Sequence, residues 1–109
     1  MYSKELVAAS TVPLILSILT GGRSYGYLII KKVKELSGGE LSWSEAMLYP
    51  VLKRMEKDGM ITATWVMTEG SRKRKYYDIT DFGKSVLHKK QAEWYSLTSV
   101  FSKLWSLNN

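Results

Sequence analysis

The chain has 109 residues, of which 45% are hydrophobic, so it is long enough to bury the core of one domain. Sixteen Lys and Arg residues against ten Asp and Glu residues leave a formal net charge of +6, which favours polyanionic partners such as nucleic acid or an acidic membrane. The sequence has no cysteine and a single histidine, which excludes disulfides, thiolate metal sites and imidazole-rich metal clusters.

The first predicted element is a helix over residues 4–20. Apolar residues recur there at helical spacing, and Gly21-Gly22 ends the pattern. Pro13 lies inside this stretch and has no backbone N–H. We therefore expect either a bend in the helix or a short separate segment before Pro13.

Two shorter helices are predicted next. Ser24 is expected to cap a helix over residues 25–36. Ser44 is expected to open a third helix that ends at Asp58-Gly59, although a capping box beginning at Ser42 fits the sequence as well. The start of the third helix is thus defined to within about two residues.

The hydrophobic period changes after the third helix. Residues 61–68 and 75–79 are rich in β-branched and aromatic side chains and are separated by a short polar turn, which predicts a β-hairpin. Tyr76 and Tyr77 alternate along the second strand, so one ring should pack inward and the other should face solvent or DNA. Thr80 is then expected to cap a long final helix with one apolar stripe.

This order of elements predicts an α+β, mainly helical fold, a winged helix-turn-helix with a long C-terminal helix. In such a fold the third helix enters the major groove and the hairpin reaches the flanking backbone. Seven cations against three acids lie between positions 53 and 75, so four of the six surplus charges fall there. These cations are Lys53, Arg54, Lys57, Arg72, Lys73, Arg74 and Lys75. Such a cluster would bind phosphates in a salt-sensitive way without reading base sequence.

Base reading is expected at the start of the third helix, from Ser44, Glu45 and Met47, because that end of the helix normally points at base edges. The simpler explanation of the basic cluster is a solvated surface. However, the four consecutive cations from position 72 to 75 would repel one another at a hairpin tip. Their placement is easier to understand if an anion normally lies opposite them.

Several motifs run through the chain, namely Leu48-Tyr49-Pro50, the stretch from Leu52 to Gly59, Arg74-Lys75-Tyr76-Tyr77 and Thr80-Asp81-Phe82-Gly83. In order and spacing they resemble the PadR family of transcriptional regulators, over nearly the whole chain, and the single last helix resembles its small subclass. The resemblance implies a homodimer that binds double-stranded operator DNA as a repressor. It also implies that Tyr49 and the basic wing, Arg72 to Lys75, face DNA, and we add Tyr77 to this set. Where the family often has Thr, Ser or Asn two residues before the tyrosine, this chain has Met47.

The final helix is the predicted dimer contact, because one apolar stripe on so long a helix cannot be covered in a small monomer. Residues 80–109 would pair with a symmetry mate and pack against residues 1–79, the winged DNA-binding part, as one unit. In the small subclass, a tryptophan at the position matching Trp94 flanks a dimer-interface cavity in which flat aromatic compounds stack. The resemblance thus implies a ligand site formed by Trp94, Leu97, Thr98, Lys90 and Leu14. The alternative is that Trp94 fills a dry interface.

Enzymatic chemistry is not expected. His88 lies among lysines without a Ser, Cys or second His nearby, so neither catalytic residues nor a metal nor a cofactor are predicted. The apolar stretch from Val12 to Leu19 is too short to cross a bilayer, and we expect a cytoplasmic location with no membrane partner. Two other classes of function stay open, a protein-interaction module on a winged-helix scaffold and a membrane-surface binder that uses the last helix.

Overall fold

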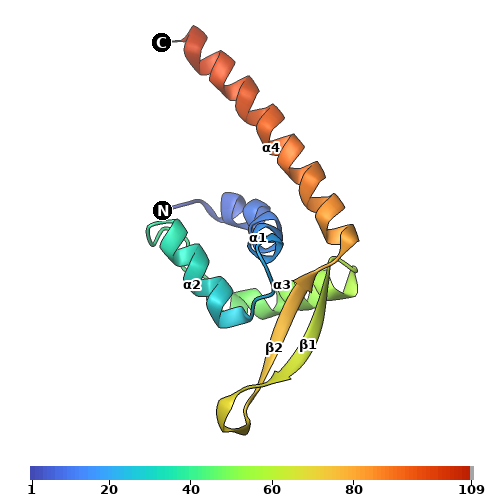
Figure 1. Cartoon of the computed structure of the whole chain (residues 1–109). Coiled ribbons are helices and arrows are strands. Elements are labelled where there is room, and N and C mark those ends of the chain that lie inside the picture. Colours follow the sequence, from blue (N-terminus) through green and yellow to red (C-terminus); the bar gives the residue numbers. More distant parts are fainter. Residues whose placement is uncertain (109) are drawn as a thin grey trace.

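The computed structural model describes residues 1–108 (Figure 1). Its elements are the helices α1 (Lys4–Thr20), α2 (Gly26–Leu36) and α3 (Glu45–Lys57), the strands β1 (Ile61–Met67) and β2 (Lys73–Ile79) with a single 3-10 turn, η1 (Glu69–Ser71), between them, and the helix α4 (Asp81–Leu107). The predicted α+β, mainly helical class is confirmed, as is the winged-helix order of the elements.

Short hydroxyl side chains fix where the helices begin. The Ser44 hydroxyl accepts a hydrogen bond from the Met47 N–H at 3.1 Å, and the Thr80 hydroxyl accepts one from the Gly83 N–H at 3.0 Å. Ser3 caps α1 in the same way. Each cap satisfies an N–H group that has no partner within its own helix. The predicted starts of α3 at Ser44 and of α4 at Thr80 are therefore confirmed.

Ser24 does not cap α2, and that prediction is wrong. The cap position is Tyr25, whose side chain makes no capping hydrogen bond. The backbone of Ser24 instead pairs with Tyr77 of β2, through hydrogen bonds of 3.1 and 2.7 Å. Ser24 is buried, and its hydroxyl has no hydrogen-bond partner within residues 1–108. The loop before α2 is thus attached to the hairpin like a short third strand.

Helix α1 continues through Pro13, so no separate segment precedes the proline. The hydroxyls of Thr11, Ser17 and Thr20 donate to the carbonyl groups four residues earlier, at 2.6, 2.7 and 2.9 Å. Hydrogen bonds of this kind often accompany helix bending. They show that these three hydroxyl groups are satisfied within the helix, which leaves its apolar side chains for packing.

The hairpin is longer than predicted on its second strand. Strands β1 and β2 pair antiparallel, with Ile61 opposite Ile79 and Met67 opposite Lys73, so β2 begins at Lys73 rather than at residue 75. The basic start of β2 has low strand propensity, but its partners on β1 are apolar residues that favour pairing. At the turn, Gly70 and Ser71 both have positive φ angles, of 76° and 63°.

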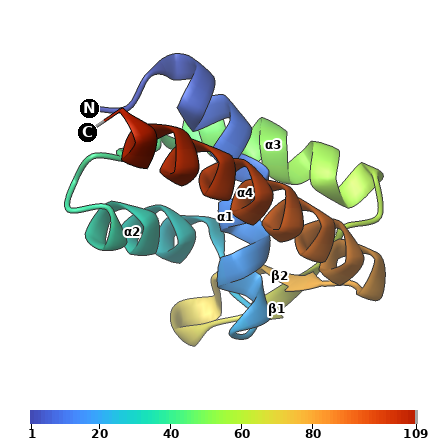
Figure 2. The same cartoon turned by 90° about the horizontal axis from the view of Figure 1, so that it is seen from above.

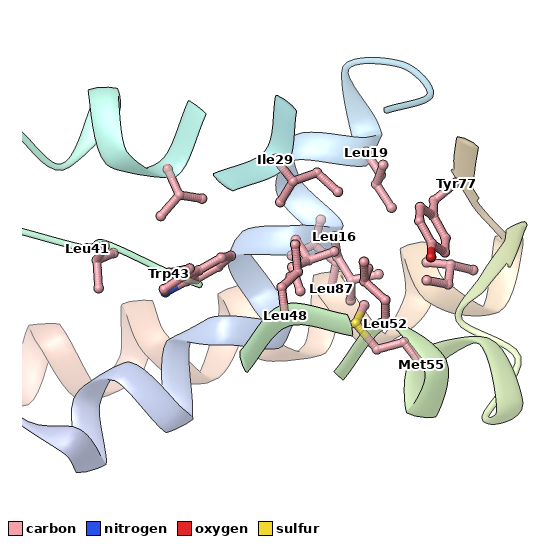
Figure 3. Close-up of a cluster of buried hydrophobic side chains, with 13 residues drawn as sticks. Leu16, Leu19, Ile29, Leu41, Trp43, Leu48, Leu52, Met55, Tyr77 and Leu87 are labelled. Atoms are coloured by element: carbon pink, nitrogen blue, oxygen red, sulfur yellow. The ribbon is translucent and has the colours of Figure 1, made fainter. Parts of the chain in front are cut away.

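The core lies where α1, α2 and α3 meet the base of the hairpin and the first turns of α4 (Figure 3). The largest fully buried side chains are Ile15, Leu16, Ile29, Leu48, Leu52, Met55 and Ile61. Leu87 brings α4 into the same cluster. Because α3 contributes one buried face to this core, its opposite face is held rigidly toward solvent.

Helix α4 extends beyond the rest of the molecule. Its buried residues, Gly83 and Leu87, both lie near its start, and residues 91–108 are exposed. Figure 1 shows α4 rising away from the core, and Figure 2 shows it passing over α1. The molecule therefore measures 60 Å along its longest axis against 29 and 21 Å along the others. No helix within residues 1–108 is both long and apolar enough to span a membrane.

Candidate nucleic-acid interface

A groove of about 1180 Å³ separates the hairpin from α3 and the start of α2. Six cations line it, namely Lys53, Lys57, Arg72, Lys73, Arg74 and Lys75. Among the described residues Glu56 is the one carboxylate in its walls, so the groove carries a large excess of positive charge. A groove of this charge concentrates a polyanion through the summed field of its walls.

Helix α3 places its cations in the groove by simple helical spacing. Leu48, Leu52 and Met55 face the core, whereas Tyr49, Lys53 and Lys57 follow one another at intervals of four residues and line the groove. Tyr49 packs against the start of α2 so closely that a methyl group at Gly26 would come within 2.6 Å of the Tyr49 hydroxyl oxygen. A side chain at position 26 would therefore displace the Tyr49 ring.

The structure does not bring the other candidates of the third helix into the groove. Ser44 and Glu45 are exposed at the start of α3, where the Ser44 hydroxyl is occupied by its capping bond. Met47 is half-buried and packs against the core. Arg54 forms an ion pair with Asp58, at 3.2 Å, outside the groove lining.

The basic wing is not the crowded tip that the sequence predicted. Because β2 begins at Lys73, the side chains alternate, and Lys73 and Lys75 lie on one face of the hairpin while Arg74 lies on the other. The Lys75 ammonium group is 3.7 Å from a carboxylate oxygen of Glu56 and 5.8 Å from the centre of the Trp65 ring. Because successive side chains of β2 point to opposite faces, the cations lie farther apart, and their mutual repulsion is weaker than expected for a crowded hairpin tip.

Tyr77 is a core residue that also borders the groove, and its burial argues against the predicted contact with DNA. The side chain is 2% exposed, and Figure 3 shows its ring among the buried leucines and Met55. Burial raises the pKa of the Tyr77 hydroxyl, and the nearby Tyr49 and Glu56 add to this effect. Tyr77 and Ile79 are two residues apart on β2, so their side chains lie on the same face of the strand. Ile79 lies opposite Ile61 of the core, and this alternation would have identified Tyr77 as the inward ring.

Sequence reasoning missed three aromatic residues of the groove. Tyr25, Tyr27 and Trp65 line it together with Tyr49 and Tyr77. Trp65 is 62% exposed and lies opposite Lys75 in the hairpin register, a signal that strand pairing could have supplied. Large exposed aromatic rings beside cations are common in surfaces that bind other molecules.

A second groove, of about 480 Å³, lies between α1 and α4. Leu14 and Trp94 line it, whereas Lys90, Leu97 and Thr98, predicted to belong to the same ligand site, are not part of its walls. Four other lining side chains are aliphatic, namely Leu6, Pro13, Leu41 and Leu87, and two are tyrosines. The structure thus brings together the helix-one and tryptophan parts of the predicted ligand site, whereas Lys90 is half-buried outside the groove and Leu97 and Thr98 lie on the exposed part of α4.

Comparison with known proteins agrees with this geometry. The model of the transcriptional regulator PadR-like family matches residues 15–89. A transcriptional regulator from Clostridium thermocellum is 31% identical, with a TM-score of 0.82 over 92% of this chain and 97% of that one. A PadR family transcription regulator from Clostridium difficile R20291 is 35% identical, with a TM-score of 0.78 over 88% and 98% of the two chains.

Among curated sequences, the negative transcriptional regulator PadR of Bacillus subtilis is 35% identical over 68% of this chain, which corresponds to 41% of that protein. The matched segment of the family model contains α2, α3 and the whole hairpin, the elements that form the basic groove. The family resemblance read from the motifs is thereby confirmed. This chain belongs to the PadR-like family of transcriptional regulators.

Proposed function

We propose that the protein is a homodimeric regulator that binds double-stranded operator DNA through the groove between α3 and the hairpin. The observation that carries the proposal is the basic groove, with six cations and one carboxylate in the described walls, beside the exposed face of α3. Each cation that meets a phosphate releases condensed counterions and so contributes to affinity. The negative regulator of Bacillus subtilis supports repression as the outcome, at the protein's own gene or at adjacent genes.

In this proposal, α3 enters the major groove and the hairpin follows the backbone beside it. Lys53 and Lys57 on α3 would reach phosphates on one side, and the wing cations would reach them on the other. Base contacts are assigned to Tyr49, which lines the groove, and to Glu45, which is exposed at the start of α3 outside the groove lining. Met47 is half-buried and could offer only an apolar contact, for example to a thymine methyl group.

Replacing Lys53 or Lys73 with alanine is expected to weaken duplex binding about tenfold and to make the salt dependence shallower. A dimer loses two phosphate contacts per substitution, so the slope of log affinity against log salt should change by roughly 1.8. Fluorescence anisotropy of a labelled duplex at several salt concentrations measures both quantities. A matched control is Lys89→Ala, which removes the same charge from an exposed position of α4 outside the groove.

An equal loss in Lys89→Ala would show that net charge, rather than the groove, governs binding. If all three variants kept the wild-type affinity and salt slope, the DNA-binding role of the groove would be refuted. If the protein were instead a protein-interaction module, all three variants would keep the wild-type affinity for DNA. Unrelated DNA sequences would then also bind without preference in a competition assay. Selective binding of one duplex would favour an operator-binding regulator.

The exposed stripe on α4 supports the homodimer. Trp94, Leu97, Phe101, Leu104 and Trp105 are between 37% and 62% exposed in the single chain. The first four recur at spacings of three and four residues, and Trp105 follows Phe101 by four, so they form one continuous apolar face. A second copy of the helix, related by a two-fold axis, would cover this face with the same residues.

A second proposed role is relief of DNA binding by a flat aromatic compound in the groove between α1 and α4. The observation that favours it is the apolar lining of that groove around Leu14 and Trp94. The indole of Trp94 is 37% exposed, which leaves a ring face available for stacking. In a dimer, the half-buried Lys90 and the exposed Leu97 and Thr98 would extend the site along α4.

Titration with a planar aromatic dye is expected to quench tryptophan fluorescence in the wild type, and most of this quenching should disappear in Trp94→Leu. The physical reason is that the dye stacks on the Trp94 ring. Trp105→Leu is the matched control, because it removes another tryptophan of the same helix that does not line the groove. Undiminished quenching in Trp94→Leu would contradict the assignment.

A further inference from the structure

Four side chains from two separate segments stack beside the wing. The Arg74 guanidinium carbon lies 4.1 Å from the centre of the Tyr25 ring. Tyr25 meets Tyr76 edge to face, with ring centres 5.3 Å apart and an angle of 70° between their planes. The Arg23 guanidinium carbon lies 5.1 Å from the centre of the Tyr76 ring. This Arg74, Tyr25, Tyr76 and Arg23 stack joins β2 to the loop before α2.

The backbone holds this stack in place. Tyr25 is the cap residue of α2, and the preceding residue, Ser24, pairs with Tyr77 through two hydrogen bonds. The Arg23 side chain also contacts Asp78, with a nitrogen to oxygen distance of 3.4 Å. Tyr25 therefore has little freedom to move relative to β2, and any side chain that stacks on its ring shares that restriction.

We propose that Tyr25 is a positioning residue for DNA binding: its ring, supported by Tyr76, holds the Arg74 guanidinium at the rim of the basic groove so that the N–H edge meets a phosphate. The inference rests on the proposed function. Stacking uses the flat face of a guanidinium and leaves the N–H groups in its plane free for a bidentate contact with an anion. Arg74 and Tyr25 both line the groove, so the stack lies where the duplex would pass.

The physical advantage is preorganisation. Arg74 is exposed on a strand near the hairpin turn, and a free arginine there would lose side-chain freedom when it binds a phosphate. The Tyr25 ring restricts the guanidinium before DNA arrives, so less freedom is lost on binding. Lys73 and Lys75, on the other face of the hairpin, gain nothing from Tyr25 and serve as internal comparisons.

The test is a double-mutant cycle between Tyr25→Leu and Arg74→Gln, with duplex affinity and salt slope as readouts. Tyr25→Leu is expected to lower affinity about fivefold per wing, from loss of the cation–π contact and of the preorganised side chain. In the Arg74→Gln background the same substitution should have almost no further effect. Tyr25→Phe keeps the ring and is expected to restore most of the affinity that Tyr25→Leu loses.

A measurement without DNA accompanies the cycle. The Arg74 side-chain Nε–H resonance should be shifted by the Tyr25 ring current in the wild type and in Tyr25→Phe, and the shift should be absent in Tyr25→Leu. If Tyr25→Leu does not fold, Tyr76→Leu, which removes the support of the Tyr25 ring, replaces it in the cycle. Thermal denaturation of each variant separates a general loss of stability from the specific loss of binding.

Two results would overturn the role of Tyr25 and leave the proposed function intact. Equal losses for Tyr25→Leu in the wild-type and Arg74→Gln backgrounds would show that Tyr25 does not act through Arg74. An affinity for Tyr25→Phe as low as that of Tyr25→Leu would assign the effect to the hydroxyl group instead of the ring. A wild-type protein that binds no duplex would instead overturn the proposed function, and the role of Tyr25 with it.

Discussion

Aspartate at both Phe101 and Leu104 is expected to abolish dimerisation and to lower affinity for a duplex with two half-sites by at least about a hundredfold. These side chains are 42% and 49% exposed in the single chain and lie one turn apart on the apolar stripe of α4. In the proposed dimer each would be buried against the partner. An unpaired carboxylate in such an interface costs several kcal/mol, and the two-fold axis doubles the number of buried charges.

The loss of DNA affinity follows from the loss of the linked second half-site. Two joined binding modules exceed the affinity of one by roughly 100-fold to 10000-fold when both can engage. Sedimentation equilibrium measures the oligomeric state, and anisotropy with a duplex selected by the wild-type protein from a random pool measures affinity. Ser96→Asp with Ser99→Asp adds the same charge on the opposite side of α4 and should preserve both properties. A dimer that survives in the Phe101 and Leu104 variant would refute the proposed interface.

Local signals explain why most of the helices could be predicted. The starts of α3 and α4 depend on the hydroxyls of Ser44 and Thr80, each of which bonds a backbone N–H three residues later. The same local rule fails at Ser24, because the serine backbone forms hydrogen bonds with Tyr77, which is distant in sequence. The start of α2 is therefore one residue later than predicted. The sequence shows a serine that could cap the helix, but it does not show the distant strand residue that pairs with the backbone of that serine.

The basic groove could be predicted only in part, for a similar reason. The spacing of Lys53 and Lys57 places them on one face of α3 whatever surrounds the helix. On the wing, however, the face of each cation depends on where β2 begins, and pairing with β1 sets that residue. The stack of Arg74 on Tyr25 joins distant segments, so no pattern in either segment predicts it.

Gly83→Ala is expected to destabilise the protein by about 3 kcal/mol, although alanine stabilises most helix positions relative to glycine by about 1 kcal/mol. A methyl group at Gly83 would overlap the carbonyl oxygen of Met60 and lie 2.9 Å from a side-chain carbon of Ile79. The Met60 carbonyl cannot withdraw freely, because it accepts a hydrogen bond of 3.1 Å from the Thr80 N–H. The Thr80 hydroxyl in turn donates to the Gly59 carbonyl at 2.6 Å, so the turn before β1 and the start of α4 are locked together.

Thermal and urea denaturation should show this loss as a fall in Tm of roughly 15 °C. The matched control is Gly21→Ala at the end of α1, where the φ angle is −79° and the nearest atom to an added methyl group is 3.5 Å away. That variant should stay within about 1 kcal/mol of the wild type. Equal stability of the two variants would show that the start of α4 can shift away from the Met60 carbonyl. Because the first turn of α4 sets the direction of the whole helix, such a shift would also change how the two DNA-binding faces of the proposed dimer are spaced.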